Sequence, residues 1–183
     1  MKLTDKKVKD FLSDLAAKTP TPGGGSAAAL AGAMAAALVA MVAEFTLGKE
    51  KYRSVEKDFQ EILNKAKKLQ RELTDLIDKD SQAYEEVVKS KNSAEAIKKA
   101  AEIPLQTAEK SLLVLQMAKF AHKYGNQKLA SDSFGAVYLA KTAIGIALEN
   151  VKINLPYLAE EKTREKITTS IEKIMKLTEE INC

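Results

Sequence analysis

A run of three glycines is the first candidate for chemistry in this sequence. Gly23, Gly24 and Gly25 follow TPTP, and Ser26 then opens an alanine-rich run. Glycines let a ligand approach the backbone closely, and the free N–H groups at a helix start favour an anion. The run lacks the lysine of a P-loop and follows no predicted strand, which excludes a Walker loop and a dinucleotide fingerprint. Two interpretations remain open: a tight turn with Ser26 as the N-cap of the next helix, or a loop that lines a binding site.

Asp80 is the second candidate, because it interrupts an apolar pattern. Residues spaced alternately by three and four form a heptad seam, and Asp80 occupies one of its positions. The members are Tyr52, Val55, Phe59, Ile62, Ala66, Leu69, Leu73, Leu76, Asp80, Ala83 and Val87. A carboxyl group among apolar side chains has the raised pKa that general acid or base catalysis needs. The alternatives are that it reaches solvent or pairs with a lysine on a neighbouring helix.

Asp132 and Lys141 are weaker candidates, each with an ordinary structural explanation. Asp132 lies in SDS at 131–133, where serine and aspartate are also good N-caps for the following helix. Lys141 is the only charged residue between 133 and 148. Its side chain is expected either to extend along its helix to solvent or to pair with Asp80 or an anionic ligand.

Several classes of function are excluded by composition. The 29 Lys and Arg against 25 Asp and Glu give a net charge of +4, spread along the chain with few aromatics, which does not indicate a nucleic-acid binder. The only histidine, His122, and the only cysteine, Cys183, cannot form a transition-metal cluster, so no metal is expected. Residues 26–43 carry no charge, but their alanine-rich composition argues against a membrane span. A cytoplasmic protein is expected.

Helical spacing dominates the rest of the chain and predicts an all-α fold. We expect one domain over residues 1–183, an up-and-down bundle of about six or seven helices, with one long heptad-patterned helix of roughly 35 to 40 residues. Pro104 is expected to interrupt or kink the helix that begins near Ser93. Two helices, starting near Ser26 and near 131–133, are apolar on most faces, which predicts a homodimer that covers them.

Five segments, in order, resemble the cyclodeaminase/cyclohydrolase family, which includes the C-terminal domain of formimidoyltransferase-cyclodeaminase. They are PTPGGGSAAALAGAMAAALVAMV with the following LGKEKY, then DSQAYEEVV, IPLQTAE, GNQKLASDSFGAVYLAKTA and ENVKINL. The resemblance spans roughly residues 10 to 160. It implies an all-helical, dimeric folate enzyme that needs no permanently bound cofactor, with a tetrahydrofolate derivative as substrate, with or without a polyglutamate tail.

The activity implied by the resemblance is cyclisation of 5-formimidoyltetrahydrofolate to 5,10-methenyltetrahydrofolate with release of ammonia, a step of histidine degradation. Two alternatives stay open: methenyltetrahydrofolate cyclohydrolase, and a non-catalytic helical interaction module. Asp80 is the expected proton-transfer group, and Asp132 is a second acid or binds the pterin. Gly23, Gly24, Gly25, Ser26, Asn126, Ser131 and Lys141 are expected to bind substrate.

Overall fold

The chain folds into helices joined by short turns in a computed structural model that describes residues 2–181. Met1, Asn182 and Cys183 lie outside the described residues, and so does the prediction made for Cys183. The α-helices are α1 (Val8–Leu15), α2 (Gly24–Thr46), α3 (Glu56–Lys89), α4 (Ala94–Tyr124), α5 (Ala130–Asn154) and α6 (Glu161–Glu180). Short 3-10 helices are η1 (Leu3–Asp5), η2 (Glu50–Val55), η3 (Gln127–Leu129) and η4 (Leu155–Tyr157). Residues 2–181 contain no strand, so the predicted all-α fold is confirmed.

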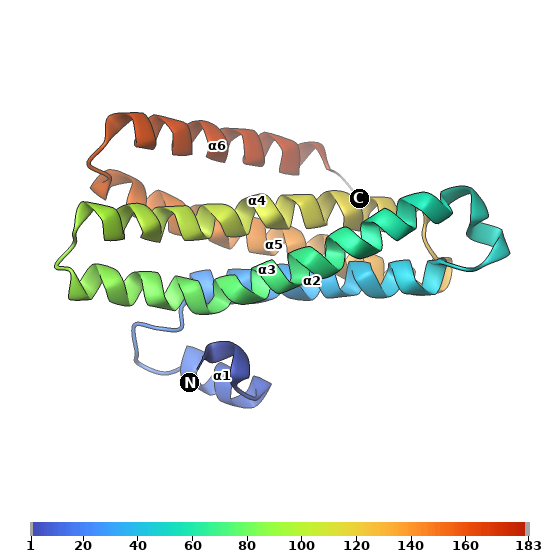
Figure 1. The fold of residues 1–183 in the computed structure, drawn as a ribbon, viewed down its shortest axis with the longest axis horizontal. Coiled ribbons are helices and arrows are strands. Elements are labelled where there is room, and N and C mark those ends of the chain that lie inside the picture. Colours follow the sequence, from blue (N-terminus) through green and yellow to red (C-terminus); the bar gives the residue numbers. More distant parts are fainter. Residues whose placement is uncertain (1, 182–183) are drawn as a thin grey trace.

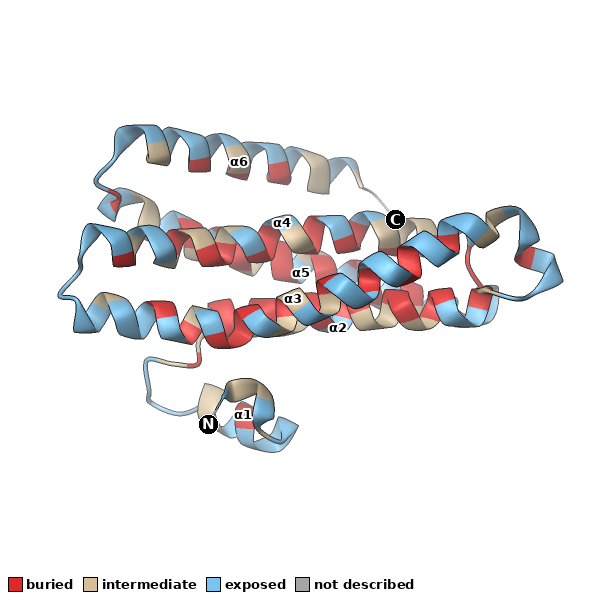
Figure 2. Ribbon diagram, in the orientation of Figure 1, coloured by how far each residue is buried: buried red, intermediate tan, exposed pale blue. Residues whose placement is uncertain are grey.

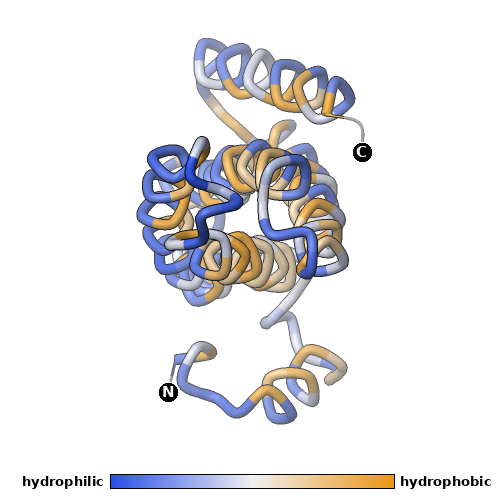
Figure 3. The backbone as a smooth tube through the Cα atoms, turned by 90° about the vertical axis from the view of Figure 1, so that its right-hand side faces the viewer, coloured by the Kyte–Doolittle hydropathy of each residue, from blue (hydrophilic) through white to orange (hydrophobic). Residues whose placement is uncertain are grey.

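Helices α2 to α5 form an antiparallel four-helix bundle (Figure 1). Each packs against the next in the chain, and α5 closes the ring against α2. Seen along the bundle, α6 lies on one side and the N-terminal segment on the other (Figure 3). Buried residues gather on the inner faces of the four helices, whereas α6 buries a single stripe (Figure 2). The bundle therefore supplies most of the core.

Helix α2 is the small-residue helix of the bundle, and its neighbours approach it closely. A Cβ atom at Gly32 would lie 2.6 Å from the Ser111 hydroxyl oxygen of α4 and 3.2 Å from a methyl carbon of Leu73 on α3. Glycine is required there by packing. Among the described helices, α2 alone is long and apolar enough to cross a bilayer, but most of it is buried between α3, α4 and α5. A core helix of a bundle shows the same composition.

The heptad seam predicted from Tyr52 to Val87 is the buried edge of α3. Its apolar members are buried except Val55 and Val87, which are half-buried, as is Asp80. The helix itself has 34 residues and starts at Glu56, because the first two seam members lie in η2. The seam thus places Asp80 at the inner edge of α3, about two and a half turns before the helix ends at Lys89.

Two local expectations differ from the structure. Pro104 was expected to interrupt or kink its helix, and the interruption is absent, since α4 runs unbroken from Ala94 to Tyr124 with the proline buried inside it. The SDS segment does not supply the N-cap of α5, because a 3-10 turn, η3, precedes the helix and moves its start to Ala130. Ser133 turns inward instead, where its hydroxyl donates to the Ala130 carbonyl at 2.9 Å and lies 3.0 Å from His122 Nδ1.

Candidate active site

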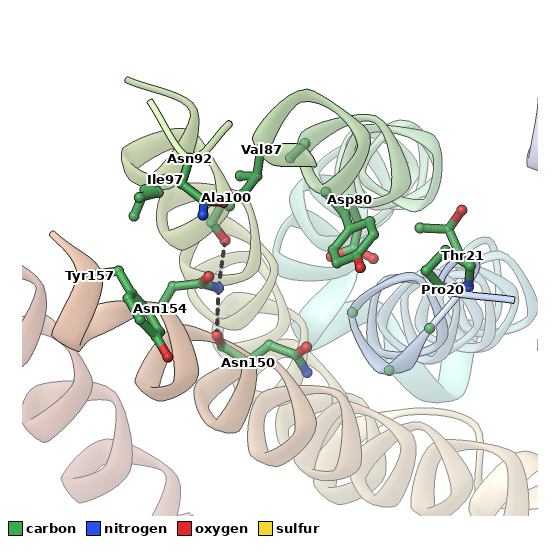
Figure 4. Close-up of a pocket in the computed structure, with 15 residues that line it drawn as sticks. Pro20, Thr21, Asp80, Val87, Asn92, Ile97, Ala100, Asn150, Asn154 and Tyr157 are labelled. Carbon is green, nitrogen blue, oxygen red and sulfur yellow. Dashed lines mark hydrogen bonds between the residues drawn. The ribbon is translucent and has the colours of Figure 1, made fainter. Parts of the chain in front are cut away.

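The main cavity opens at the end of the bundle where α2 and α4 begin and α3 and α5 end. It has a volume of about 490 Å³, within the range of small-molecule sites. Figure 4 shows the residues that line it, which come from the glycine loop, α3, the turn after α3, α4, α5 and η4. They are Pro20, Thr21, Gly23, Gly24, Gly25, Asp80, Ala83, Tyr84, Val87, Asn92, Ile97, Ala100, Asn150, Asn154 and Tyr157.

Asp80 lies against the first turn of α2. Its Oδ2 accepts a hydrogen bond from the Ser26 hydroxyl at 2.9 Å. Ser26 was predicted to be the N-cap of α2. That prediction was wrong: the helix begins at Gly24, Gly23 is its N-cap, and the Ser26 side chain points to α3, where it also contacts the Ile77 carbonyl at 3.0 Å.

Only one of the three glycines is required by contact. A Cβ atom at Gly25 would lie 2.0 Å from Asp80 Oδ1 and 2.5 Å from its Cγ, closer than real atoms approach. At Gly24 the nearest atom would be 3.4 Å away, on Asn150, and at Gly23 it would be 3.8 Å away. Gly25 is therefore the residue that lets a carboxyl group from another helix reach the start of α2.

The pKa of Asp80 is raised above its ordinary value. Burial is the main cause, because it penalises the charged form, and the hydrogen bonds from the Ser26 hydroxyl and backbone N–H oppose it without cancelling it. A ligand anion at the N-terminus of α2 was one of the two interpretations of the glycine run. Asp80 itself takes that position, so the helix dipole favours its carboxylate. A carboxyl group held between these opposing effects is suited to both giving and taking a proton.

The cavity also contains polar and aromatic residues that the sequence did not single out. Asn154 donates through Nδ2 to the Ala100 and Asn150 carbonyls at 3.2 and 2.9 Å, as the dashed lines in Figure 4 show. Asn150 donates to the Ile146 carbonyl at 2.8 Å. Both side-chain carbonyl oxygens are thereby left without a partner among the described residues and can accept from ligand N–H groups. In the sequence, the spacing of four residues between Asn150 and Asn154, near the end of a long helix, indicates that the two side chains lie on the same face.

Two tyrosines give the cavity aromatic surface. Tyr84 of α3 is 46% exposed and Tyr157 of η4 is 67% exposed. Exposed aromatic rings beside a cavity can stack on a flat heterocycle. Tyr84 belongs to the DSQAYEEVV segment quoted above, whereas nothing in the sequence marked Tyr157 as near Asp80.

The remaining predicted site residues lie elsewhere in the chain. Asn126, Ser131 and Asp132 are at the α4–α5 turn, next to the C-terminus of α2 and so about 34 Å of helix from the glycine loop. None of the three lines the cavity. The hydrogen-bonding groups of Asn126 already have partners within the fold. Its backbone N–H donates to the Thr46 hydroxyl, its Nδ2 donates to the Phe45 carbonyl, and its Oδ1 accepts from the Lys128 N–H.

Lys141 is half-buried in the middle of α5 and also lies away from the cavity lining. Among the described residues it forms no ion pair with Asp80, so the pairing that we considered from sequence is absent within one chain. The structure therefore brings Gly23, Gly24, Gly25, Ser26 and Asp80 together at one end of the bundle, and separates them from the other four predicted residues.

Comparison with known proteins identifies the family of this chain. The model of the family described as formiminotransferase-cyclodeaminase matches residues 7–173. The chain belongs to this family. It is 36% identical over 181 residues to the methenyltetrahydrofolate cyclohydrolase of Methylorubrum extorquens, covering 88% of this chain and 87% of the relative.

Two further family members show how this chain relates to longer and to solved relatives. The formimidoyltransferase-cyclodeaminase of Mus musculus is 28% identical over 94% of this chain, which matches only 35% of that protein. A crystal structure of formiminotetrahydrofolate cyclodeaminase from Thermotoga maritima superposes with a TM-score of 0.92 and 31% identity, covering 97% of this chain and 92% of that one. These relatives are folate one-carbon enzymes, and this chain is an enzyme of the same family.

Proposed function

We propose that this chain is a formimidoyltetrahydrofolate cyclodeaminase. It would cyclise 5-formimidoyltetrahydrofolate to 5,10-methenyltetrahydrofolate and release ammonia. The observation that carries the proposal is Asp80, a carboxyl group with a raised pKa that lines the cavity. A raised pKa makes the protonated form of the carboxyl group more available to supply a proton to a departing amine.

The reaction needs proton transfers at N10 and at the departing nitrogen. N10 attacks the formimidoyl carbon, the new C–N bond forms, and N10 loses its proton. The amino group then gains a proton, the bond between the carbon and that nitrogen breaks, and ammonia leaves. When the formimidoyl group is bound in its neutral form, Asp80 gives its proton to that group as N10 attacks, takes the N10 proton, and gives it to the amino group. The carboxyl group then ends the reaction as a carboxylate and must regain one proton from solvent.

The cavity has the chemistry that such a substrate needs. The formimidoyl group is an amidine and carries positive charge when protonated, and the lining residues include a carboxyl group but no lysine or arginine. The free carbonyl oxygens of Asn150 and Asn154 suit the N–H groups of a pterin, and Tyr84 and Tyr157 offer surface for its ring. Without a lining cation, the glutamate tail would extend toward the cavity mouth.

Methenyltetrahydrofolate cyclohydrolase is the second candidate. The 36% identity to the Methylorubrum extorquens cyclohydrolase, over most of both chains, favours it. Water would attack the same one-carbon bridge, with Asp80 as the base that takes the proton of the water. Both reactions pass through a tetrahedral carbon between two nitrogens, so one site can serve either.

The two activities are separated by one pair of assays. Purified protein is mixed with 5-formimidoyltetrahydrofolate and, separately, with 5,10-methenyltetrahydrofolate, while methenyl absorbance and ammonia are followed. A cyclodeaminase raises the absorbance and releases ammonia with the first substrate, and a cyclohydrolase lowers the absorbance with the second. Asp80→Asn is expected to reduce turnover by about 10²- to 10⁴-fold, with the helical circular dichroism unchanged. Inactivity of the wild type with both substrates leaves the helical interaction module as the surviving alternative.

A homodimer is part of this proposal. The outer faces of α2 and α5 expose Met34 (49%), Phe45 (53%), Phe134 (41%) and Tyr138 (55%). The same faces carry almost no charge, which suits burial against a second copy with the same surface. A two-fold axis across the middle of this face would bring the α4–α5 turn of one copy, with Asp132, toward the glycine loop of the other. Met34→Asp is expected to yield a monomer by size-exclusion chromatography with light scattering; a dimer that persists would contradict this interface.

A further inference from the structure

Two cavities lie on opposite sides of the glycine loop, and a chain of hydroxyl groups joins them. The second cavity has a volume of about 370 Å³ and lies between the N-terminal segment and α3. Thr21 lines both cavities, so the segment before the glycines is the wall between them. Asp80 faces the first cavity and Ser81, the next residue of α3, faces the second.

Ser26 connects the two. Its buried hydroxyl lies 2.9 Å from Asp80 Oδ2 and 3.1 Å from the Ser81 hydroxyl. Both distances are those of hydrogen bonds between oxygen atoms. The Ile77 carbonyl, 3.0 Å away, gives the Ser26 proton a third acceptor. One hydroxyl proton with three acceptors can rotate between them, and such rotation resets a relay after each proton has passed.

We propose that Ser26 and Ser81 relay protons between Asp80 and the second cavity while substrate fills the first. Outward transfer moves the Asp80 proton to Ser26 as the Ser26 proton passes to Ser81 and the Ser81 proton passes to water. The O–H bond broken at each oxygen is replaced by a new one, so both hydroxyls are regenerated. Inward transfer reverses each step.

This inference rests on the proposed function, because each candidate reaction changes the number of bound protons. Hydrolysis of the methenyl group releases one proton to solvent. Cyclodeamination of the neutral formimidoyl group takes one up, because the product methenyl group is a cation and ammonia leaves. Asp80 must therefore exchange a proton with solvent in each cycle, and a bound folate would block the direct route through the first cavity.

The second cavity is a suitable end for the relay. A volume of about 370 Å³ has room for several waters. Its charged groups are Asp78 and Glu85 on α3 and Lys2, Lys6 and Asp14 in the N-terminal segment. Most of them already have partners: Asp78 accepts from the Leu3 N–H and the Thr4 hydroxyl, Lys6 pairs with Asp14, and Glu85 pairs with Lys89. Water is thus the expected proton acceptor.

The test is Ser81→Ala, assayed with whichever folate the wild type turns over. We expect kcat to fall on the order of tenfold, less than for loss of the acid itself, with KM unchanged. The solvent deuterium isotope effect on kcat should increase, and small buffer acids such as imidazole should restore part of the rate. Ser81→Thr retains the hydroxyl and has the second cavity beside it for the extra methyl group, so it should keep most of the activity.

Ser111→Ala is the matched control, because it removes another buried serine hydroxyl of the bundle that has no hydrogen-bond partner. It should leave kcat and the isotope effect unchanged. A wild-type kcat, isotope effect and buffer response in Ser81→Ala would overturn the relay and leave the enzymatic function standing. Inactivity of the wild type with both folates would overturn the function and the relay together.

Discussion

Replacing Gly25 by alanine tests whether Asp80 is held against the start of α2. The new Cβ atom would lie 2.0 Å from Asp80 Oδ1, 2.5 Å from Cγ and 2.8 Å from Oδ2. Ordinary van der Waals contact begins at 3.4 Å, so Oδ1 must move by about 1.4 Å, the difference between 2.0 and 3.4 Å. The side chain of Asp80 can rotate away, but it then loses its hydrogen bond to Ser26.

The expected loss of stability follows from two opposing contributions. Breaking a hydrogen bond to a carboxyl group costs about 1.5 to 3 kcal/mol. Alanine in place of glycine in a helix gains up to about 1 kcal/mol. Gly24→Ala carries the same gain without the clash, because its nearest atom is 3.4 Å away. We therefore expect Gly25→Ala to be less stable than Gly24→Ala by about 2 kcal/mol, which corresponds to about 4 to 8 °C in Tm for a chain of this size.

Gly25→Ala and Gly24→Ala should differ more in activity than in stability. A displacement of about 1 Å at a catalytic group can reduce turnover by about 100-fold, so Gly25→Ala should lose most activity while Gly24→Ala keeps it. Thermal unfolding by circular dichroism and the methenyl absorbance assay measure the two effects. In an Asp80→Ala background the atoms that clash are gone, and the stability cost of Gly25→Ala should disappear. Equal stability and activity of the two glycine variants would refute the packing of Asp80 on α2.

Three further predictions concern stability. Asp80→Asn should become more stable relative to the wild type as pH rises from about 4. A raised pKa means that the folded wild type binds the Asp80 proton more tightly than the unfolded chain does, and this stabilisation is lost as the proton leaves. Urea unfolding at several pH values measures the difference in stability, and a difference that does not change with pH would contradict the prediction. Ser111→Ala should stabilise the protein by about 1 kcal/mol, because it removes a buried hydroxyl that has no hydrogen-bond partner among the described residues. Ser133→Ala loses two hydrogen bonds and should destabilise the protein by a similar amount. Equal unfolding free energies for the two variants by calorimetry would refute the distinction. Lys91→Gly should stabilise by about 1 kcal/mol, because Lys91 has a left-handed backbone with φ of 54°. Lys68→Gly, at an exposed position in the middle of α3, should destabilise by about as much. A lower Tm for Lys91→Gly than for the wild type would count against that conformation.

The helices and the position of Asp80 could be predicted because both depend on local periodicity. The seam from Tyr52 to Val87 repeats often enough to define the buried edge of α3, and a carboxyl group on that edge is visible without any knowledge of its neighbours. Helix starts were less predictable. Ser26 and the SDS segment have the residue types of N-caps, but packing moved both helix starts upstream and turned Ser26 and Ser133 inward.

Which residues share the site was decided by tertiary structure alone. The sequence shows three equivalent glycines, and only the approach of Asp80, 55 residues away in the chain, makes the third one necessary. The GNQKLASDSFGAVYLAKTA segment belongs to the same family pattern as the glycines, yet α2 separates Asn126, Ser131 and Asp132 from them by its full length within one chain. Local propensity determines where helices form, whereas contacts between segments distant in sequence depend on how those helices pack, and no short-range pattern encodes that.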